Sequence, residues 1–512
     1  MSATDSVAVS AAPEGPTAGR LHRRALGVPD LVFFIVAAAA PLTAVAGGQA
    51  VTYLITGNKA IPFLFIPLAI LLGVFAVGYA AMSHHVADAG AFYTYVTRGL
   101  GRIPGVGTAF GALVSYNAMQ VGIYGLFGVA TSAFMSDKLG ITLEWYWWCL
   151  IGGAIIAALG VLQIDLNARV LAVFLLLEVL VLALFDLAIG VDPGPAGITS
   201  IGFSPSVATG AALGTALVAG IASFVGFESA AIYSEECKDP KRTVARATFI
   251  AVGCIAVFYA ISSWMLANAV GPDTIVSAEA LVKAGYATGG APDPTTVLFI
   301  AGESRLGAFW GDSASLLFCT SIFASLLSFH NAVARYFFAL GRERVLPGGF
   351  ARTSARTGAP VVGSVTQSAI ALVIVATFAI TNTDPILKLF TWLTQMGALG
   401  VVLLMAVTSF AVVAFFRRRP GLESSRWRTV VAPVLSGLGM LAILVLGVAN
   451  FNVLITGSTD APTDTMSIVL PAILFGSVIV GMLVAAWIRS HDRVRYAHIG
   501  ERTQVEEAEH VV

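Results

Sequence analysis

A carboxylate, Glu228, stands two residues after Gly226 near the end of an apolar stretch of this sequence. A carboxylate at membrane depth is costly, so it faces a water-filled cavity or a partner within a helical bundle. The glycine allows a helix to break, which frees backbone groups to bind a polar ligand. A dense charged turn, EECKDPKR at residues 235–242, comes directly afterwards. We therefore interpret Gly220–Arg246 as one half of a binding site inside a membrane, which Glu228 either gates or supports by capping the next helix.

The second carboxylate of interest is Glu178, in the middle of the apolar run LLLEVLVL at residues 175–182. No opposite charge lies three or four residues away on either side, which excludes a salt bridge within one helix. Apolar surroundings favour the neutral acid, and contact with water favours the ion. A carboxyl that changes its protonation in this way suits the coupling of proton movement to a conformational change. The alternative is a permanently protonated acid that hydrogen-bonds a neighbouring helix.

The elements that must position these residues follow from the composition. Of the 512 residues, 57% are apolar and 11% are charged, whereas a soluble domain carries about 25% charged residues. Twelve stretches hold few charges or none, and each approaches the roughly 20 residues that cross a bilayer core. A membrane β-barrel would instead show alternating segments of about ten residues. We predict an all-α polytopic membrane protein with twelve transmembrane helices. The stretches are Leu31–Asn58, Ala60–Val86, Ile103–Ser136, Trp145–Ile164, Val170–Leu187, Phe203–Phe227, Ala247–Gly271, Ser313–Ala334, Pro360–Thr383, Leu389–Phe416, Thr429–Thr459 and Met466–Ile488.

Two of these stretches are interrupted at corresponding places. The first contains AAPLT at residues 39–43, and the sixth contains Ser223 and Gly226. Proline inside a helix removes one backbone hydrogen bond and displaces the carbonyl four residues earlier. Because stretches one and six begin two successive groups of five, the breaks occupy equivalent positions in two halves. Paired breaks of this kind indicate a binding site near the midplane of a transporter built from inverted repeats.

The distribution of basic residues predicts the orientation. With twelve spans both termini lie on one side, which we place on the cytoplasmic side of the plasma membrane. A strong excess of arginine and lysine on the cytoplasmic side obeys the positive-inside rule, and a missed span would destroy it. Of the 29 Lys and Arg, those expected outside are Lys59, Lys138, Lys283, Arg305 and Lys388.

Three segments make up the predicted organisation. Residues 1–24 form a disordered cytoplasmic tail rich in Ala, Ser, Pro and Gly, residues 25–490 the twelve-helix transporter domain, and residues 491–512 a polar cytoplasmic tail. The net charge is zero, and the basic residues follow topology, so we expect no nucleic-acid partner. P-loop, GxSxG, HExxH and CxxC motifs are absent from the sequence, so we expect no enzymatic activity, cofactor or metal. The oligomeric state stays open.

Four blocks of sequence resemble motifs of the amino acid–polyamine–organocation (APC) superfamily of permeases, in particular the bacterial amino acid permeases. Together they cover most of spans two to nine. The blocks are AGAFYTY with GLG (89–95, 99–101), GFES with EECKDPKR (226–229, 235–242), NAVARY with GRE and LP (331–336, 341–343, 346–347), and GAP (358–360).

The resemblance implies a secondary transporter with the LeuT-type five-plus-five inverted repeat and broken helices 1 and 6. It also implies import of an amino acid or related small amine, with an ionisable coupling group near Glu178. The sequence departs from the family in span one, where APLTA at residues 40–44 replaces a Gly-Ser-Gly type of break. This Pro-x-Thr break is similar to that of some polyamine importers, but the acidic residue that tends to follow theirs is missing here, which weakens a polycationic substrate.

We expect the substrate to lie between the two breaks. Amides near residues 42–44 would receive its carboxylate, and carbonyls of residues 222–225 its ammonium group. Phe224 would close over the molecule, unless the ring serves only packing. The candidate site residues are Ala40, Pro41, Leu42, Thr43, Ala44, Ala222, Ser223, Phe224, Val225, Gly226 and Asn117 for the substrate, and Glu178 and Glu228 for coupling or gating.

Protons are the expected driving ion, because spans one and eight offer few hydroxyl groups for sodium beyond Thr43, Ser325 and Ser328. Three alternatives stay open at this stage. The chain could carry a polyamine or an ethanolamine-like amine, it could exchange substrates without protons, or it could bind a ligand as a sensor without net transport.

Overall fold

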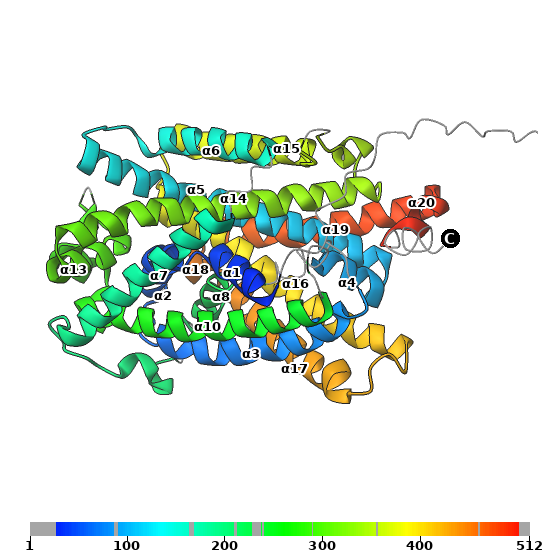
Figure 1. Ribbon diagram of the computed structural model, residues 1–512, viewed down its shortest axis with the longest axis horizontal. Helices are drawn as coiled ribbons and strands as arrows, with labels where there is room; N and C mark the ends of the chain where they lie inside the picture. Colours follow the sequence, from blue (N-terminus) through cyan, green and yellow to red (C-terminus); the bar gives the residue numbers. More distant parts are fainter. Residues whose placement is uncertain are drawn as a thin grey trace, which may run out of the picture.

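The computed structural model describes residues 27–86, 91–162, 168–208, 212–227, 237, 240–288, 290–354, 357–458 and 461–500. Helices dominate this part of the chain (Figure 1). Ten helices among the described residues are long and apolar enough to cross a membrane, and they coincide with predicted stretches two to five and seven to twelve. The all-α, multi-pass prediction is thereby confirmed. The helices are α3 (Ile61–Ser83), α5 (Arg102–Leu139), α6 (Trp145–Leu162), α7 (Ala168–Val191), α10 (Pro240–Val270), α14 (Ala308–Arg342), α15 (Val361–Ile380), α16 (Thr391–Arg418), α17 (Ala432–Ala449) and α19 (Met466–His491).

The first predicted stretch is a broken helix. α1 (Val28–Ala39) ends at Ala40, whose φ of 44° and ψ of 76° lie in the left-handed region. A π-helix, η1 (Thr43–Gln49), and α2 (Ala50–Thr56) continue the chain. A non-glycine residue in the left-handed region is uncommon. The break therefore falls where the Ala-Pro sequence predicts it.

The sixth predicted stretch is also interrupted. α8 (Ala212–Ala222) ends in a series of turns over residues 223–227. Gly226 has a φ of 113°, a conformation that side chains rarely permit. Of the charged turn at residues 235–242, the structure describes Cys237 and residues 240–242, which begin α10. Glu228 lies outside the described residues.

The long helices form layers around these breaks. α6 and α15 lie side by side along one flank and pack on α5 and α14, while α3, α10 and α17 lie along the opposite flank (Figure 1). Between the flanks, α1 packs on α7, α10 and α14, and α8 packs on α16. The two broken helices therefore occupy the middle of the bundle.

Small residues allow the central helices to approach closely, as in other membrane bundles. A Cβ atom at Gly400 of α16 would lie 1.8 Å from the Ser115 hydroxyl of α5. A Cβ atom at Gly99 would lie 2.1 Å from the carbonyl oxygen of Ala411, so α4 (Ala91–Leu100) packs directly on α16. Residues 91–100 of the block between stretches two and three thus form a helix that packs on the bundle.

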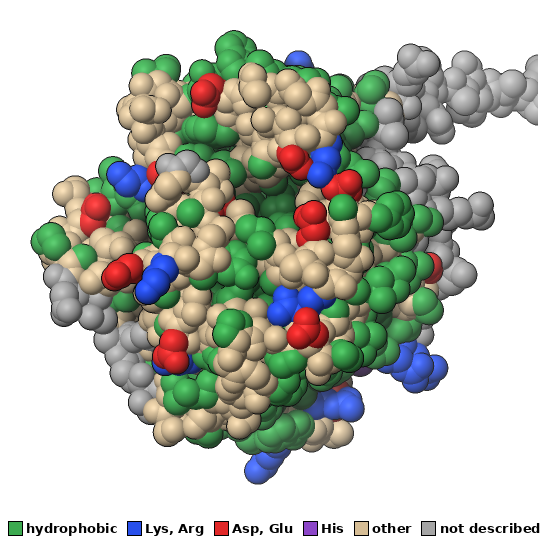
Figure 2. Space-filling view, turned by 90° about the vertical axis from the view of Figure 1, so that its left-hand side faces the viewer, with side chains coloured by type: hydrophobic (Ala, Val, Ile, Leu, Met, Phe, Trp, Pro, Cys, Tyr) green, Lys and Arg blue, Asp and Glu red, His purple; other side chains and the backbone are tan. Residues whose placement is uncertain are grey.

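Short elements cover both ends of the bundle. Figure 2 looks onto the end that carries α13 (Val297–Leu306), where acidic and basic side chains are dispersed among hydrophobic ones. At this end η5 (Pro294–Thr296) packs on η1 and α2. The other elements here are η2 (Ile201–Phe203), η3 (Pro205–Val207), α11 (Pro272–Ile275), α12 (Ala278–Lys283), the antiparallel pair β1 (Ala287–Thr288) and β2 (Ala291–Pro292), η7 (Pro385–Phe390) and α18 (Phe451–Thr456). The opposite end carries α4, η6 (Gly348–Ala351), η8 (Trp427–Val431) and α20 (Arg493–His498).

The first ten residues of the predicted C-terminal tail pack on the bundle. Arg102 donates a hydrogen bond of 2.7 Å from Nη2 to the carbonyl oxygen of Ala497, and its guanidinium lies over the ring of Tyr496. The Gly500 N–H donates to the Glu343 carboxylate over 3.0 Å. The packed part of the chain thus extends past the predicted boundary at residue 490. The predicted N-terminal tail, residues 1–24, and the last part of the predicted C-terminal tail, residues 501–512, lie outside the described residues.

Candidate substrate-binding site

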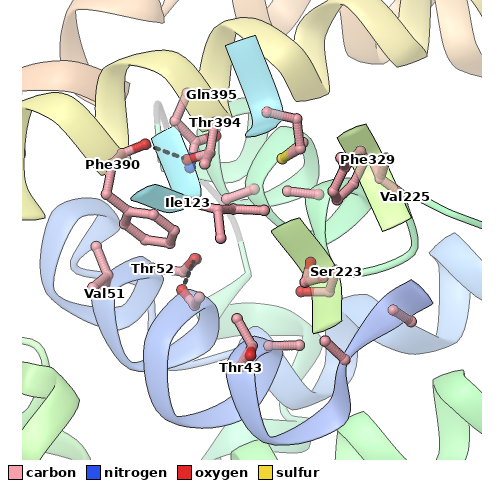
Figure 3. Close-up of a pocket in the computed structure, with 18 residues that line it drawn as sticks. Thr43, Val51, Thr52, Ile123, Ser223, Val225, Phe329, Phe390, Thr394 and Gln395 are labelled. Atoms are coloured by element: carbon pink, nitrogen blue, oxygen red, sulfur yellow. Dashed lines mark hydrogen bonds between the residues drawn. The ribbon is translucent and has the colours of Figure 1, made fainter. Parts of the chain in front are cut away.

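A cavity of about 70 Å³ lies between the two broken helices, α5, α14 and the start of α16 (Figure 3). Its wall contains hydroxyl, amide and apolar side chains, and no charged residue is among its described lining. The lining residues are Ala39, Ala40, Thr43, Ala44, Gly48, Val51, Thr52, Met119, Ile123, Ala219, Ala222, Ser223, Val225, Ser325, Phe329, Phe390, Thr394 and Gln395.

Side chains from two other helices hold the backbone at the first break. The carbonyl oxygen of Ala39, at the end of α1, accepts a hydrogen bond of 3.0 Å from the Tyr259 hydroxyl of α10. On the other side of the break, the Leu42 N–H points at Oε2 of Glu178 over a long 3.5 Å. Helix ends leave backbone groups without partners inside the helix. Here Tyr259 and Glu178 supply two of the missing partners.

Glu178 lies at the junction of α7, α14 and η1. Its side chain is buried, with 4% of the residue exposed. The Ser321 hydroxyl of α14 donates to Oε2 over 2.7 Å, and Thr43 Oγ1 donates to that same hydroxyl over 2.9 Å. No basic side chain in the described part of the chain forms an ion pair with it. The carboxyl group is therefore held by hydrogen bonds that lead directly to the first break and to a cavity residue, Thr43.

Short hydrogen-bonded turns stabilise the backbone at the second break. The Phe224 N–H donates to the carbonyl oxygen of Ile221 over 2.9 Å, and the Val225 N–H donates to that of Ala222 over 3.2 Å. The Phe224 side chain is fully buried, and its ring lies 5.8 Å from that of Phe65, centroid to centroid. This ring packs in the core rather than lining the cavity, as the alternative in the sequence analysis allows.

The structure brings together about half of the predicted substrate residues. Pro41, Leu42, Phe224 and Gly226 belong to the breaks but do not line the cavity, and Asn117 donates from Nδ2 to the Leu113 carbonyl oxygen over 2.7 Å on its own helix. Glu228 lies outside the described residues. The predicted residues that line the cavity are Ala40, Thr43, Ala44, Ala222, Ser223 and Val225.

Sequence reasoning missed the wall that α16 and its first turn supply. Phe390, Thr394 and Gln395 line the cavity from this side, opposite the breaks. A threonine and a glutamine inside an otherwise apolar stretch were a usable signal, because buried polar groups in a span mark a functional site or a contact between helices. Apolar wall residues such as Phe329 carry no comparable signal in the sequence.

Comparison with known proteins identifies the family of this chain. No curated protein sequence matches the chain closely enough to count as a relative. The profile of a family described as amino acid permease matches residues 26–484, which include both breaks, Glu178 and the whole lining of the cavity. The chain therefore belongs to the amino acid permease family of the APC superfamily, a family of membrane transporters and not of enzymes.

Proposed function

We propose that this protein imports an amino acid or related small amine across the plasma membrane by alternating access, driven by protons. Amino acid transport is the activity that its family implies. The proposal adds the inward direction and the coupling to protons. It also adds a total of twelve helices, of which two successive groups of five form an inverted repeat. The observation that carries it is the hydrogen-bonded connection from Glu178 to the break beside the cavity.

The two breaks suit the two charged groups of an amino acid. In the first turn of the helix that restarts after Ala40, the Leu42 N–H already points at Glu178 and the Ala44 N–H donates to the Ala40 carbonyl oxygen. The Thr43 N–H between them is the group that can receive a carboxylate, with the favourable end of the helix dipole behind it. α8 ends at Ala222 with the opposite polarity, which favours an ammonium group. Since no acidic side chain is found in the described lining, a polyamine is disfavoured. A charge brought into the cavity must be met by backbone groups.

Glu178 links protonation to the shape of the first broken helix. As an ion, the carboxylate accepts hydrogen bonds from Ser321 and from the backbone at Leu42. Protonation turns one oxygen into a donor and weakens this attraction. The two protonation states therefore favour different arrangements of η1 against α7 and α14. A conformational equilibrium shifts when an event such as protonation stabilises one state more than the other.

Uptake of radiolabelled amino acids into proteoliposomes tests the proposal. Uptake should rise as the external pH falls and collapse when a protonophore is added. Uptake that depends on sodium and does not change with pH would contradict proton coupling. Binding without any uptake would favour a sensor.

Thr43→Trp tests the location of the substrate. The indole would fill most of this small cavity, so it should abolish substrate binding while the protein still elutes as a folded species. Thr320→Trp on α14 is the control, because Thr320 is only partly buried and does not line the cavity. Unchanged affinity in Thr43→Trp would contradict this site.

A further inference from the structure

The side chain of Gln395 has a property that no other residue in the described lining of the cavity shows. It lies in α16 with 5% of the residue exposed and lines the cavity. Its Oε1 atom is buried and has no hydrogen-bond partner in the described part of the protein. A buried polar atom without a partner is unfavourable, and in native proteins it calls for an explanation such as a missing ligand.

Three other side-chain amides show that the position of Gln395 matters. Gln49, Asn117 and Gln367 also have a buried side-chain oxygen without a partner in the described part of the protein. None of these three residues lines the cavity. Gln395 alone among the four presents its amide to the space in which the substrate is proposed to lie, so a substrate atom can satisfy it.

Figure 3 gives the direction from which a substrate would approach this amide. Thr43 and Ser223, which belong to the two breaks, lie on one side of the cavity, and Gln395 lies on the other, with Ile123 between them. An amino acid whose carboxylate and ammonium groups are held by the breaks would extend its side chain toward Gln395. The residue is therefore placed to recognise the part of the substrate that differs between amino acids.

The rest of the wall limits the class of side chain. The Thr394 hydroxyl donates to the Phe390 carbonyl oxygen over 2.6 Å, and the Thr52 hydroxyl donates to the Gly48 carbonyl oxygen over 2.7 Å, so both protons are already used. No charged side chain is present in the described lining to balance a charged substrate side chain. The cavity volume is the space open to the centre of a water-sized sphere, and one water needs about 10–15 Å³ of such space. A cavity of about 70 Å³ therefore holds roughly five to seven water-sized groups.

We propose that Gln395 selects a small, neutral amino acid whose side chain donates a hydrogen bond, through a hydroxyl or a carboxamide group. The inference rests on the proposed location of the substrate between the two breaks. The acceptor is Oε1, and rotation of the terminal amide offers its NH₂ group to a substrate that accepts instead. Charged and large aromatic side chains are excluded by the neutral wall and by the volume.

Matched pairs of ligands test this selection in purified full-length protein. L-Threonine and L-valine have the same shape, as do L-serine and L-2-aminobutyrate, and each pair differs by one hydroxyl group. Equilibrium binding should favour the hydroxyl member about tenfold, the ratio that corresponds to one good hydrogen bond. Gln395→Leu keeps the size of the side chain and should reduce both ratios to near one, chiefly by weakening binding of the hydroxyl member.

Gln49→Leu is the matched control, because it removes a buried, unpartnered amide that does not line the cavity. It should keep the ratio within each pair, whatever it does to overall stability. Gln395→Met serves in the same way as Gln395→Leu if the leucine variant does not fold.

The outcomes separate this inference from the proposed function. Equal binding of both members of each pair by the natural protein contradicts the role of Gln395, and so does a ratio that survives in Gln395→Leu. Binding that persists in Thr43→Trp contradicts the location and, with it, the role of Gln395, but it leaves the proposed transport activity standing. Failure of every amino acid to bind contradicts the proposed function itself.

Discussion

Glu178 shows at the scale of one residue how a carboxyl group is kept inside an apolar helix. It lacks a cationic partner among the described residues, and hydrogen bonds from Ser321 and from the backbone of Leu42 take that place. Such bonds do not neutralise the charge, so the group stays sensitive to its surroundings in a way that a salt-bridged carboxylate is not. This distinguishes a group that can gain and lose a proton from one that only fastens two helices together.

Glu178→Gln is expected to separate binding from accumulation. Glutamine keeps the shape and a hydrogen-bonding oxygen but cannot change its protonation, so substrate binding and exchange should survive. Accumulation against a gradient, which for one coupled proton reaches about tenfold per pH unit, should fall to equilibration, and its pH dependence should disappear. Proteoliposome uptake at two external pH values measures both.

Two comparisons sharpen that experiment. Glu423→Gln alters a loop carboxylate that lies 3.7 Å from Arg428 and should leave accumulation unchanged. Glu228→Gln should damage binding and exchange together, because a gating or capping group is needed in every state. If Glu178→Gln still accumulates substrate with normal pH dependence, Glu178 is only a hydrogen-bonding group between helices.

At the scale of elements, the contact between α4 and α16 joins a connecting helix to the helix that lines the cavity. Gly99 packs on the backbone of Ala411, and Arg418 donates a hydrogen bond of 2.8 Å from Nη1 to the carbonyl oxygen of Gly99. The other end of α16 carries Thr394 and Gln395. A rigid helix with a cavity at one end and an anchor at the other transmits a shift of either end to the other.

Gly99→Ala is expected to destabilise the protein. Its Cβ atom would lie 2.1 Å from a backbone oxygen, which cannot move aside as a flexible side chain can. Overpacking of this kind costs about 1–3 kcal/mol, so the apparent melting temperature should fall by several degrees. Gly73→Ala is the control, since Gly73 lies in α3 with no atom within 4 Å of the new Cβ. That variant should be neutral or slightly stabilised, because alanine favours helices. Equal stability of the two variants would contradict the packing described here.

At the scale of the whole molecule, the two ends of the bundle differ in how their basic residues are balanced. At the α13 end, Lys59 pairs with Asp273, Lys138 with Asp312 and Arg305 with Asp192. The opposite end carries the run RRR at residues 417–419, where α16 ends, and further arginines in α20. A concentration of lysine and arginine favours the cytoplasmic side. The α13 end is therefore proposed to face outward.

Reporter fusions test this orientation. A fluorescent protein fused after residue 512 should fluoresce, since it folds in the cytoplasm, and a phosphatase that requires export should be active when inserted at Gly290, between β1 and β2. The same phosphatase inserted at Gly421, in the loop after α16, should be inactive. The reverse pattern of phosphatase activity would invert the proposed topology.

Much of the architecture can be predicted from the sequence because it depends on local chemistry. A bilayer core requires long apolar helices, so composition and spacing were enough to locate the ten described spans. The breaks at Ala40 and Gly226 follow from proline and glycine, whose effects on the backbone act within a few residues. Glu178 could be identified for the same reason, because a charged residue within an apolar run is visible in the local sequence alone.

What only the tertiary structure decided is which of these local features meet. Thr43, Glu178 and Ser321 are far apart in the chain, and nothing in their separate neighbourhoods predicts that they share hydrogen bonds. Phe224 packs in the core although it lies within a break. Gln395 lines the cavity although it is far from either break in the sequence. In a helix that is apolar all round, the sequence carries no periodic signal for the inward face. Packing between helices distant in sequence turns one face inward, and it thereby decides which side chains reach the substrate.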